Sequence, residues 1–143
     1  MKIGELAVAA QCSPETIRYY EKAGLLPPPS RAQNNYRYYS NAHLERLRLI
    51  RNCRKLGMSH EEIRSLLHAL ASASENCEPI NSLLDEHIRH VDARIRELAN
   101  IKEELLALRR RCAEGGALER CGIIEGLNAM EPGPAPGNRS HLN

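Results

Sequence analysis

The sequence predicts a mostly α-helical chain in which short helices and a small β-hairpin precede one long amphipathic helix. Apolar residues make up 42 % of the 143 residues, but Phe and Trp are absent, so an aliphatic core that suits helices is expected. Serine, proline and glycine stand at positions that typically start and stop short helices. Residues 80–112 contain neither Gly nor Pro and carry apolar side chains three and four positions apart, which is typical of one long helix.

The first two predicted helices are joined by a tight turn. Residues 3–10 predict a short helix, and a two-residue turn follows. Ser13 then suits the N-cap and Pro14 the first position of a second helix, which is expected to end at Gly24. Two short helices in this arrangement are typical of a helix-turn-helix.

A small β-hairpin is expected after these helices. Residues 27–40 open with three prolines, and the Asn pair at 34–35 suits a turn because asparagine tolerates positive φ. Residues 36–39 favour a strand. The hairpin would form a wing that presents Arg31 and Arg37, so the N-terminal part is predicted to be a winged helix-turn-helix domain.

A second helix pair continues this domain. Ser40 or Asn41 caps a third helix that carries five basic residues and ends near Gly57. Ser59 and Glu62 form a capping box for a fourth helix. A small, polar linker follows it.

Residues 79–112 predict a helix that needs a partner, because its apolar residues follow a mostly heptad-like stripe on one face. A coiled-coil dimer is the expected solution, and the alternative is that the helix folds back on its own N-terminal domain. The stripe consists of Ile80, Leu84, Ile88, Val91, Ile95, Leu98, Ile101, Leu105 and Leu108.

Four segments are therefore expected. Residues 1–75 form the winged helix-turn-helix domain, and residues 76–112 form the linker and dimerisation helix. Residues 113–130 form a loop and a short helix. Residues 131–143, rich in Pro and Gly, form a disordered tail.

Charge is distributed unevenly along the chain. Residues 1–70 carry eleven Lys and Arg against six Asp and Glu, a net +5, whereas residues 71–143 carry nine against twelve, a net −3. All five tyrosines lie in the basic half. Arginine and tyrosine both donate to phosphate oxygens, so this half suits a polyanion, although the tyrosines could simply pack the domain.

Other function classes are less well supported by the sequence. No apolar run reaches the roughly 18 residues of a membrane span, and the N-terminus is too polar for a signal peptide, so a cytoplasmic protein is expected. No nucleophile with a nearby base and no phosphate-binding Gly loop is recognisable, so an enzyme is not expected.

The five cysteines are odd in number and lack framework spacing, which favours metal or redox chemistry over a disulfide scaffold. Cys112 and Cys121 flank a glycine pair, and Cys77 precedes the long helix. A straight helix over 79–112 is about 50 Å long, so Cys77 cannot share an ion with Cys112 of its own chain. Cys12 and Cys53 lie within helical hairpins and are expected to be small buried hydrophobes.

The chain resembles the MerR family of bacterial transcription regulators. The resemblance rests on KIGELAVAAQCSPETIRYYEKAGLLPPPSR, NNYRYYS and LRLIRNCRKLGMSHEEI, and it covers about residues 1–125. NCEPINSLLDEHI, RRRC and CGIIEGL are similar to the cadmium- and lead-responsive members. The resemblance implies an antiparallel coiled coil between two copies and an effector-binding loop.

That arrangement implies two equivalent intersubunit metal sites, each combining Cys77 of one chain with Cys112 and Cys121 of the other. Three thiolates select soft ions. Copper sensors of the family lack a cysteine at the position of Cys77, and its zinc sensors tend to carry histidine in the loop, which is absent here. Pb(II) or Cd(II) is the expected effector, Zn(II) or Hg(II) remains possible, and a Cys112–Cys121 disulfide in a thiol redox switch is the alternative.

The resemblance also implies a homodimer on a palindromic promoter in double-stranded DNA. Members bend and untwist DNA so that RNA polymerase engages, repressing without metal and activating with it. Metal resistance or efflux genes are the expected targets. A small-molecule-binding regulator on the same scaffold is the rival reading. The expected DNA contacts are Thr16, Arg18, Tyr19, Tyr20, Arg31, Tyr36, Arg37 and Arg54.

Overall fold

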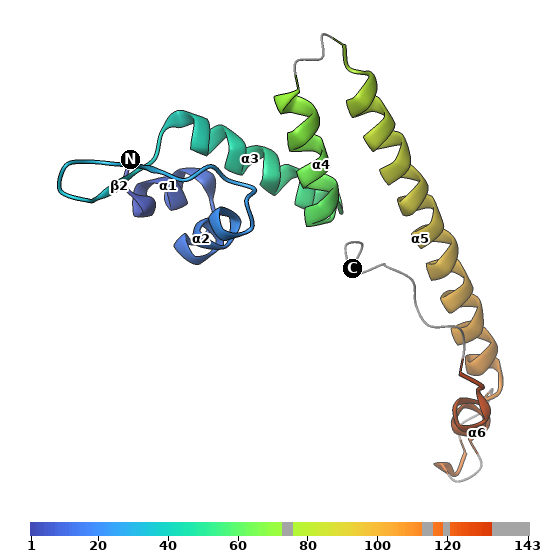
Figure 1. Ribbon diagram of the computed structural model, residues 1–143. Helices are drawn as coiled ribbons and strands as arrows, with labels where there is room; N and C mark the ends of the chain where they lie inside the picture. The colour runs from blue at the N-terminus through green and yellow to red at the C-terminus, as the bar shows by residue number, and fades with distance from the viewer. Residues whose placement is uncertain (73–75, 113–115, 119–120, 133–143) are drawn as a thin grey trace. The chain divides into compact units, whose positions relative to one another are not determined.

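The computed structural model describes residues 1–72, 76–112, 116–118 and 121–132. It divides into two compact units, Met1–Asp85 and Glu86–Leu142. The fold is mostly helical with a small antiparallel hairpin and a long C-terminal helix, as the sequence predicts (Figure 1). None of the helices in the described ranges is long and apolar enough to span a membrane.

The helix-turn-helix consists of α1 (Ile3–Ala10) and α2 (Pro14–Lys22). Helix α1 ends at Gln11, whose φ of 56° lies in the left-handed region. The Ser13 side chain accepts a hydrogen bond from the Thr16 N–H at 3.1 Å, which confirms the predicted N-cap. Gly24 follows the end of α2 with a φ of +76°, a conformation in which glycine is the least strained residue.

The wing is a two-stranded antiparallel hairpin of β1 (Ser30–Arg31) and β2 (Arg37–Tyr38), in which Ser30 pairs with Tyr38. Asn35 adopts a φ of 66° in the connecting turn. The second strand is shorter than the sequence pattern indicates, because the Tyr39 N–H leaves the hairpin and donates to the carbonyl oxygen of Met1 at 2.8 Å. The Tyr39 side chain is 3 % exposed and belongs to the core.

The second helix pair consists of α3 (Asn41–Lys55) and α4 (His60–Ala71). The capping box before α4 is complete, since the Glu62 N–H donates to Ser59 Oγ and the Ser59 N–H donates to Glu62 Oε1. Gly57, with a φ of 84°, makes the turn between the helices. Both helix boundaries therefore follow the local signals in the sequence.

The core of the first unit has two apolar clusters. One contains Leu6, Ala7, Ala10, Ile17, Leu26, Tyr39 and Leu47, and it joins α1, α2, the wing and α3. The other contains Leu25, Ile50, Cys53, Met58, Ile63 and Leu67, and it joins α3 to α4. The ring of Tyr20 packs against both clusters, so α2 and the second helix pair share one core.

The second unit contains most of α5 (Glu78–Arg110) together with α6 (Gly122–Ala129). Along α5 most apolar side chains of the predicted stripe are exposed, among them Ile88, Ile95 and Leu105 at 55 %, 58 % and 59 %, and the rest are half-buried. An apolar face of this kind suits a second copy of the chain, as the predicted coiled coil requires. The predicted disordered tail lies largely outside the described residues.

Candidate metal centre and DNA-binding surface

Cys112 and Cys121 lie side by side next to α6. Cys112 follows the end of α5, and Cys121 is the N-cap residue of α6. The two thiols are hydrogen-bonded to each other, which raises the pKa of Cys112 and helps to lower that of Cys121. All five cysteines of the chain are free thiols in this structure. The structure therefore places the two predicted ligands Cys112 and Cys121 next to each other.

The N-terminus of α6 lowers the pKa of the Cys121 thiol. The main cause is the backbone N–H groups of Ile124 and Ile123, because unpaired N–H groups at a helix start favour negative charge. The Arg109 guanidinium donates to the carbonyl oxygen of Cys112 at 2.7 Å and fixes the backbone there. Two neighbouring thiols, one of them with a lowered pKa, are suited to bind a soft cation.

Cys77 is exposed and directly precedes α5. It borders a surface cleft of about 170 Å³ whose other walls come from the end of α4 and the first turn of α5. Helix α5 contains 33 residues, so its two ends are about 50 Å apart. The third predicted ligand is therefore accessible to another molecule, at the opposite end of α5 from the thiol pair.

The two remaining cysteines belong to the helical hairpins, as expected from their positions. Cys53 is 8 % exposed within the α3–α4 cluster, and Cys12 packs against the α1–α2 cluster. Burial raises the pKa of both thiols. They are small apolar residues of the core.

Helix α2 presents all four of its predicted DNA contacts at least partly to solvent. Arg18 and Tyr19 are exposed, and the Thr16 hydroxyl lies 2.9 Å from that of Ser13. Tyr20 is half-buried and packs the domain, as the alternative reading of the tyrosines holds. The Tyr19 hydroxyl lies 3.2 Å from Nδ1 of His60, so the second helix pair fixes its position.

The wing presents Arg31, Tyr36 and Arg37 on an exposed surface. Arg31 donates to Asn35 Oδ1 at 2.9 Å, across the turn. Lys2, which no sequence pattern indicates as a contact, places its ammonium group 5.4 Å from the centre of the Tyr36 ring. These side chains form a basic and aromatic edge suited to phosphates.

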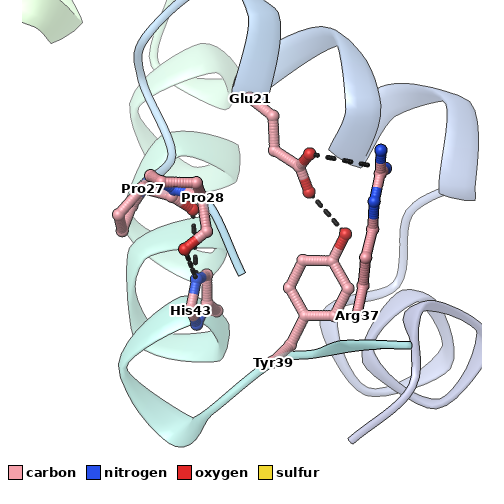
Figure 2. A network of polar contacts seen from close by, with 6 residues as sticks. All are labelled: Glu21, Pro27, Pro28, Arg37, Tyr39 and His43. Carbon is pink, nitrogen blue, oxygen red and sulfur yellow. Dashed lines mark hydrogen bonds and ion pairs between the residues drawn. The ribbon is translucent and has the colours of Figure 1, made fainter. Parts of the chain in front are cut away.

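A polar network connects the wing to α2. The Tyr39 hydroxyl donates to Glu21 Oε1 at 2.5 Å, and Glu21 Oε2 lies 4.0 Å from the Arg37 guanidinium (Figure 2). Burial and the bond to Glu21 raise the pKa of Tyr39 to about 12. The predicted phosphate ligand Arg37 thus approaches a carboxylate of α2, and these contacts hold the wing against that helix.

His43 joins the two segments that flank the wing. Its Nδ1 lies 3.1 Å from the N–H of Ser40, and its Nε2 lies 3.1 Å from the carbonyl oxygen of Pro27 (Figure 2). A backbone N–H only donates and a carbonyl only accepts, so the ring carries its proton on Nε2. This buried ring links the start of α3 to the proline segment before β1.

Several arginines of the second helix pair hydrogen-bond backbone carbonyls. Arg51 donates to the carbonyl oxygen of Ala10, Arg54 to that of Met58 and Arg64 to that of Ala23. Each acceptor lies at or near a helix end, where carbonyls lack helical partners. The predicted DNA contact Arg54 therefore also stabilises the turn before α4.

Comparisons with known proteins agree with this architecture. The family described as "MerR HTH family regulatory protein" matches residues 1–70, and the family described as "MerR, DNA binding" matches residues 44–108. A curated relative from Haemophilus influenzae, the HTH-type transcriptional regulator ZntR homolog, is 50 % identical over 111 residues, which cover 78 % of this chain and 82 % of the relative.

Two similar solved structures contain metal ions. The transcription regulator PbrR691 from Ralstonia metallidurans CH34 in complex with lead(II) has a TM-score of 0.81 and 42 % identity, covering 89 % of this chain and 98 % of that one. The regulator MerR from Bacillus megaterium MB1 in complex with mercury(II) has a TM-score of 0.74 and 30 % identity, covering 90 % and 99 %.

These relatives are transcription regulators and not enzymes. Their similarity extends over the winged helix-turn-helix, the second helix pair and the long helix. The chain belongs to the MerR family of helix-turn-helix regulatory proteins.

Proposed function

We propose that this protein is a transcription regulator whose effector is a soft divalent metal ion, Pb(II) or Cd(II). The observation that carries the proposal is the pair of neighbouring thiols, Cys112 and Cys121, at the start of α6, where backbone N–H groups lower the pKa of Cys121. Thiolates prefer soft ions, and the similar PbrR691 structure holds lead(II).

The full site combines three thiols from two chains. Cys77 and the Cys112–Cys121 pair flank a helix of 33 residues, whereas a metal–thiolate bond is only about 2.3 Å long. Antiparallel pairing of two α5 helices brings Cys77 of one chain to the thiol pair of the other. The exposed apolar face of α5 supports this pairing, and two-fold symmetry gives two equivalent sites.

The DNA-binding surface combines α2 with the wing. Helix α2 of each subunit enters a major groove, and the basic edge of the wing contacts the flanking phosphates. The match of residues 1–70, which include α2 and the wing, to a family of helix-turn-helix regulatory proteins supports this assignment. A dimer reads a palindromic promoter, and an ion that joins the two chains changes the shape of the dimer and thereby of the DNA.

In this proposal the metal-free dimer represses and the metal-bound dimer activates by untwisting the promoter for RNA polymerase. The genes that it controls serve metal resistance or efflux. Such a regulator works where bacterial DNA is, in the cytoplasm.

Metal titration of the reduced protein tests the proposal. Pb(II), Cd(II), Zn(II) and Hg(II) are added separately while the sulfur-to-metal charge-transfer absorption and the affinity in competition with a chelator are measured. We expect one ion per chain, with Pb(II) or Cd(II) activating transcription from the promoter at the lowest free concentration. If Zn(II) or Hg(II) activates transcription at the lowest free concentration, that ion is the effector instead. Activation by an oxidant without metal would favour a redox switch.

Two cysteine variants sharpen the test. Cys77→Ser should abolish the transcriptional response to metal and leave DNA binding intact, since residue 77 lies outside α2 and the wing. Cys12→Ser is the matched control and should leave metal stoichiometry unchanged, because that thiol packs against the core. A normal metal response in the Cys77→Ser variant would contradict the three-thiol site.

A further inference from the structure

Helix α6 lies beside the end of α5 (Figure 1). Two of its glycines, Gly122 and Gly126, are one helical turn apart and face residues at that end. A Cβ atom added to Gly126 would lie 2.7 Å from Leu108 Cδ2 and 2.6 Å from an Arg111 guanidinium nitrogen. A Cβ atom added to Gly122 would lie 2.6 Å from the Arg111 carbonyl oxygen and 3.0 Å from Arg111 Cβ. Both positions therefore exclude a side chain in the structure as it stands.

The two contacts differ in the kind of atom that blocks the added group. At Gly126 the neighbouring atoms are the far ends of flexible side chains, which can rotate away at small cost. At Gly122 they are the backbone oxygen and the Cβ of Arg111, which move only if the main chain moves. Ordinary contact begins near 3.4 Å, so a side chain at residue 122 would displace the backbone by about 0.8 Å, the difference between 3.4 and 2.6 Å.

This close approach is adjacent to both thiols. Arg111 precedes Cys112, and Gly122 follows Cys121. Arg109 holds the Cys112 carbonyl on the α5 side, and the Cys121 N–H donates to the Leu118 carbonyl oxygen at 3.1 Å on the loop side. The backbone contact between residues 111 and 122 is thus the point at which the two ends of the loop meet.

We propose that Gly122 is a positioning residue for the thiol pair. Its missing side chain permits the backbone contact with Arg111, and that contact sets the separation of the Cys112 and Cys121 sulfurs. Metal–ligand distances tolerate deviations of only about 0.2 Å, so a shift of the size required by a Cβ atom disturbs any ion held by both sulfurs. The expected effect of residue 122 on metal affinity rests on the proposed function. Its effect on the separation of the two sulfurs does not.

Three alanine variants of the full-length protein test this assignment. Gly122→Ala is the test, and Gly126→Ala meets only movable side-chain ends. Gly116→Ala is the matched control, because nothing lies within 4 Å of a Cβ atom at that position. Far-UV circular dichroism of each variant establishes that the helices are retained.

The first measurement needs no metal. Each protein is equilibrated with mixtures of reduced and oxidised glutathione, and the Cys112–Cys121 disulfide is quantified by mass spectrometry. Two protein thiols and one glutathione disulfide give one protein disulfide and two glutathione thiols, so the equilibrium constant reports how readily the two sulfurs meet. The second measurement is Pb(II) and Cd(II) affinity by chelator competition.

We expect Gly122→Ala to lower the equilibrium constant for disulfide formation and the association constant for metal by about tenfold or more. This is the size of effect that residues supporting metal ligands typically have. Gly126→Ala should have a smaller effect, and Gly116→Ala should stay within about threefold of the wild type. Equal constants for Gly122→Ala and Gly116→Ala, or a larger effect at residue 126 than at residue 122, would overturn the assignment. If the wild type binds no metal, the proposed function fails and the glutathione equilibrium still decides the role of Gly122.

Discussion

Replacement of Tyr39 by Phe removes the hydroxyl that connects the wing to α2 and leaves the buried ring in place. The hydroxyl donates to Glu21 Oε1 at 2.5 Å, and the Glu21 side chain is only 15 % exposed. A hydrogen bond to a charged, largely buried group contributes about 1.5–3 kcal/mol. We therefore expect Tyr39→Phe to lower the free energy of unfolding by about 2 kcal/mol, or roughly 30-fold in the folding equilibrium constant.

Urea unfolding at one protein concentration measures this loss. With a slope of about 2 kcal/mol per molar urea, the midpoint should fall by about 1 M. Tyr38→Phe is the matched control, because Tyr38 is the neighbouring wing tyrosine and is 41 % exposed. Its midpoint should stay close to that of the wild type.

The pH dependence gives a second test of the same bond. The pKa of Tyr39 is raised from 10 to about 12, so the native state favours the protonated hydroxyl. Its contribution is fully present below pH 10 and is lost as the pH rises toward 12. The stability difference between the wild type and Tyr39→Phe should shrink over this interval. Equal urea midpoints for the wild type and Tyr39→Phe at pH 8 would show that the bond to Glu21 does not stabilise the fold. A stability difference that is unchanged up to pH 12 would show that it does not depend on the protonated hydroxyl.

Three further substitutions have defined outcomes. Burial and two nearby arginines lower the pKa of His60, so its contribution to stability is lost as the pH falls below 6.5, and His60→Phe should flatten the loss of urea stability between pH 7.5 and 5. Arg37→Ala should weaken promoter binding and reduce the slope of log affinity against log salt by about 0.9 per lost phosphate contact, and an unchanged slope would remove Arg37 from the phosphate contacts. Arg51→Met should lower the thermal midpoint, since it removes the hydrogen bonds to the Ala10 carbonyl and the Gln11 side chain at the helix turn; an unchanged midpoint would show that these bonds contribute nothing.

Local rules predicted most helix boundaries. Ser13 and Pro14 before α2, and Ser59 with Glu62 before α4, act through hydrogen bonds within three residues, so the sequence alone contains the information. Gly24 acts through its own backbone conformation. Such signals do not depend on the rest of the fold.

The wing was predicted less well because distant contacts decide its second strand. The pattern over residues 36–39 favours a strand, but Tyr39 turns into the core and its N–H bonds to Met1. The contacts of the α3 arginines also depend on distant residues. Their positive charge is visible in the sequence, whereas the carbonyl groups that Arg51 and Arg54 contact become apparent only in three dimensions.

The thiol pair was predicted from cysteine spacing and the resemblance to a family, and the structure brings Cys112 and Cys121 together. The close approach of Gly122 to Arg111 could not be predicted, because glycine in a sequence does not reveal which atom its absent side chain would meet. The pairing of Cys77 with a second chain remains a prediction.

Complementation between two inactive variants tests the intersubunit site most directly. Cys77→Ser and Cys112→Ser proteins, each without a complete site, are unfolded together, refolded as mixed dimers, and separated by differently charged tags. We expect the heterodimer to bind one Pb(II) or Cd(II) ion with the wild-type charge-transfer absorption, because Cys77 of the Cys112→Ser chain meets the intact thiol pair of its partner. A heterodimer that binds no more metal than either parent homodimer would show that the two chains do not share a metal site.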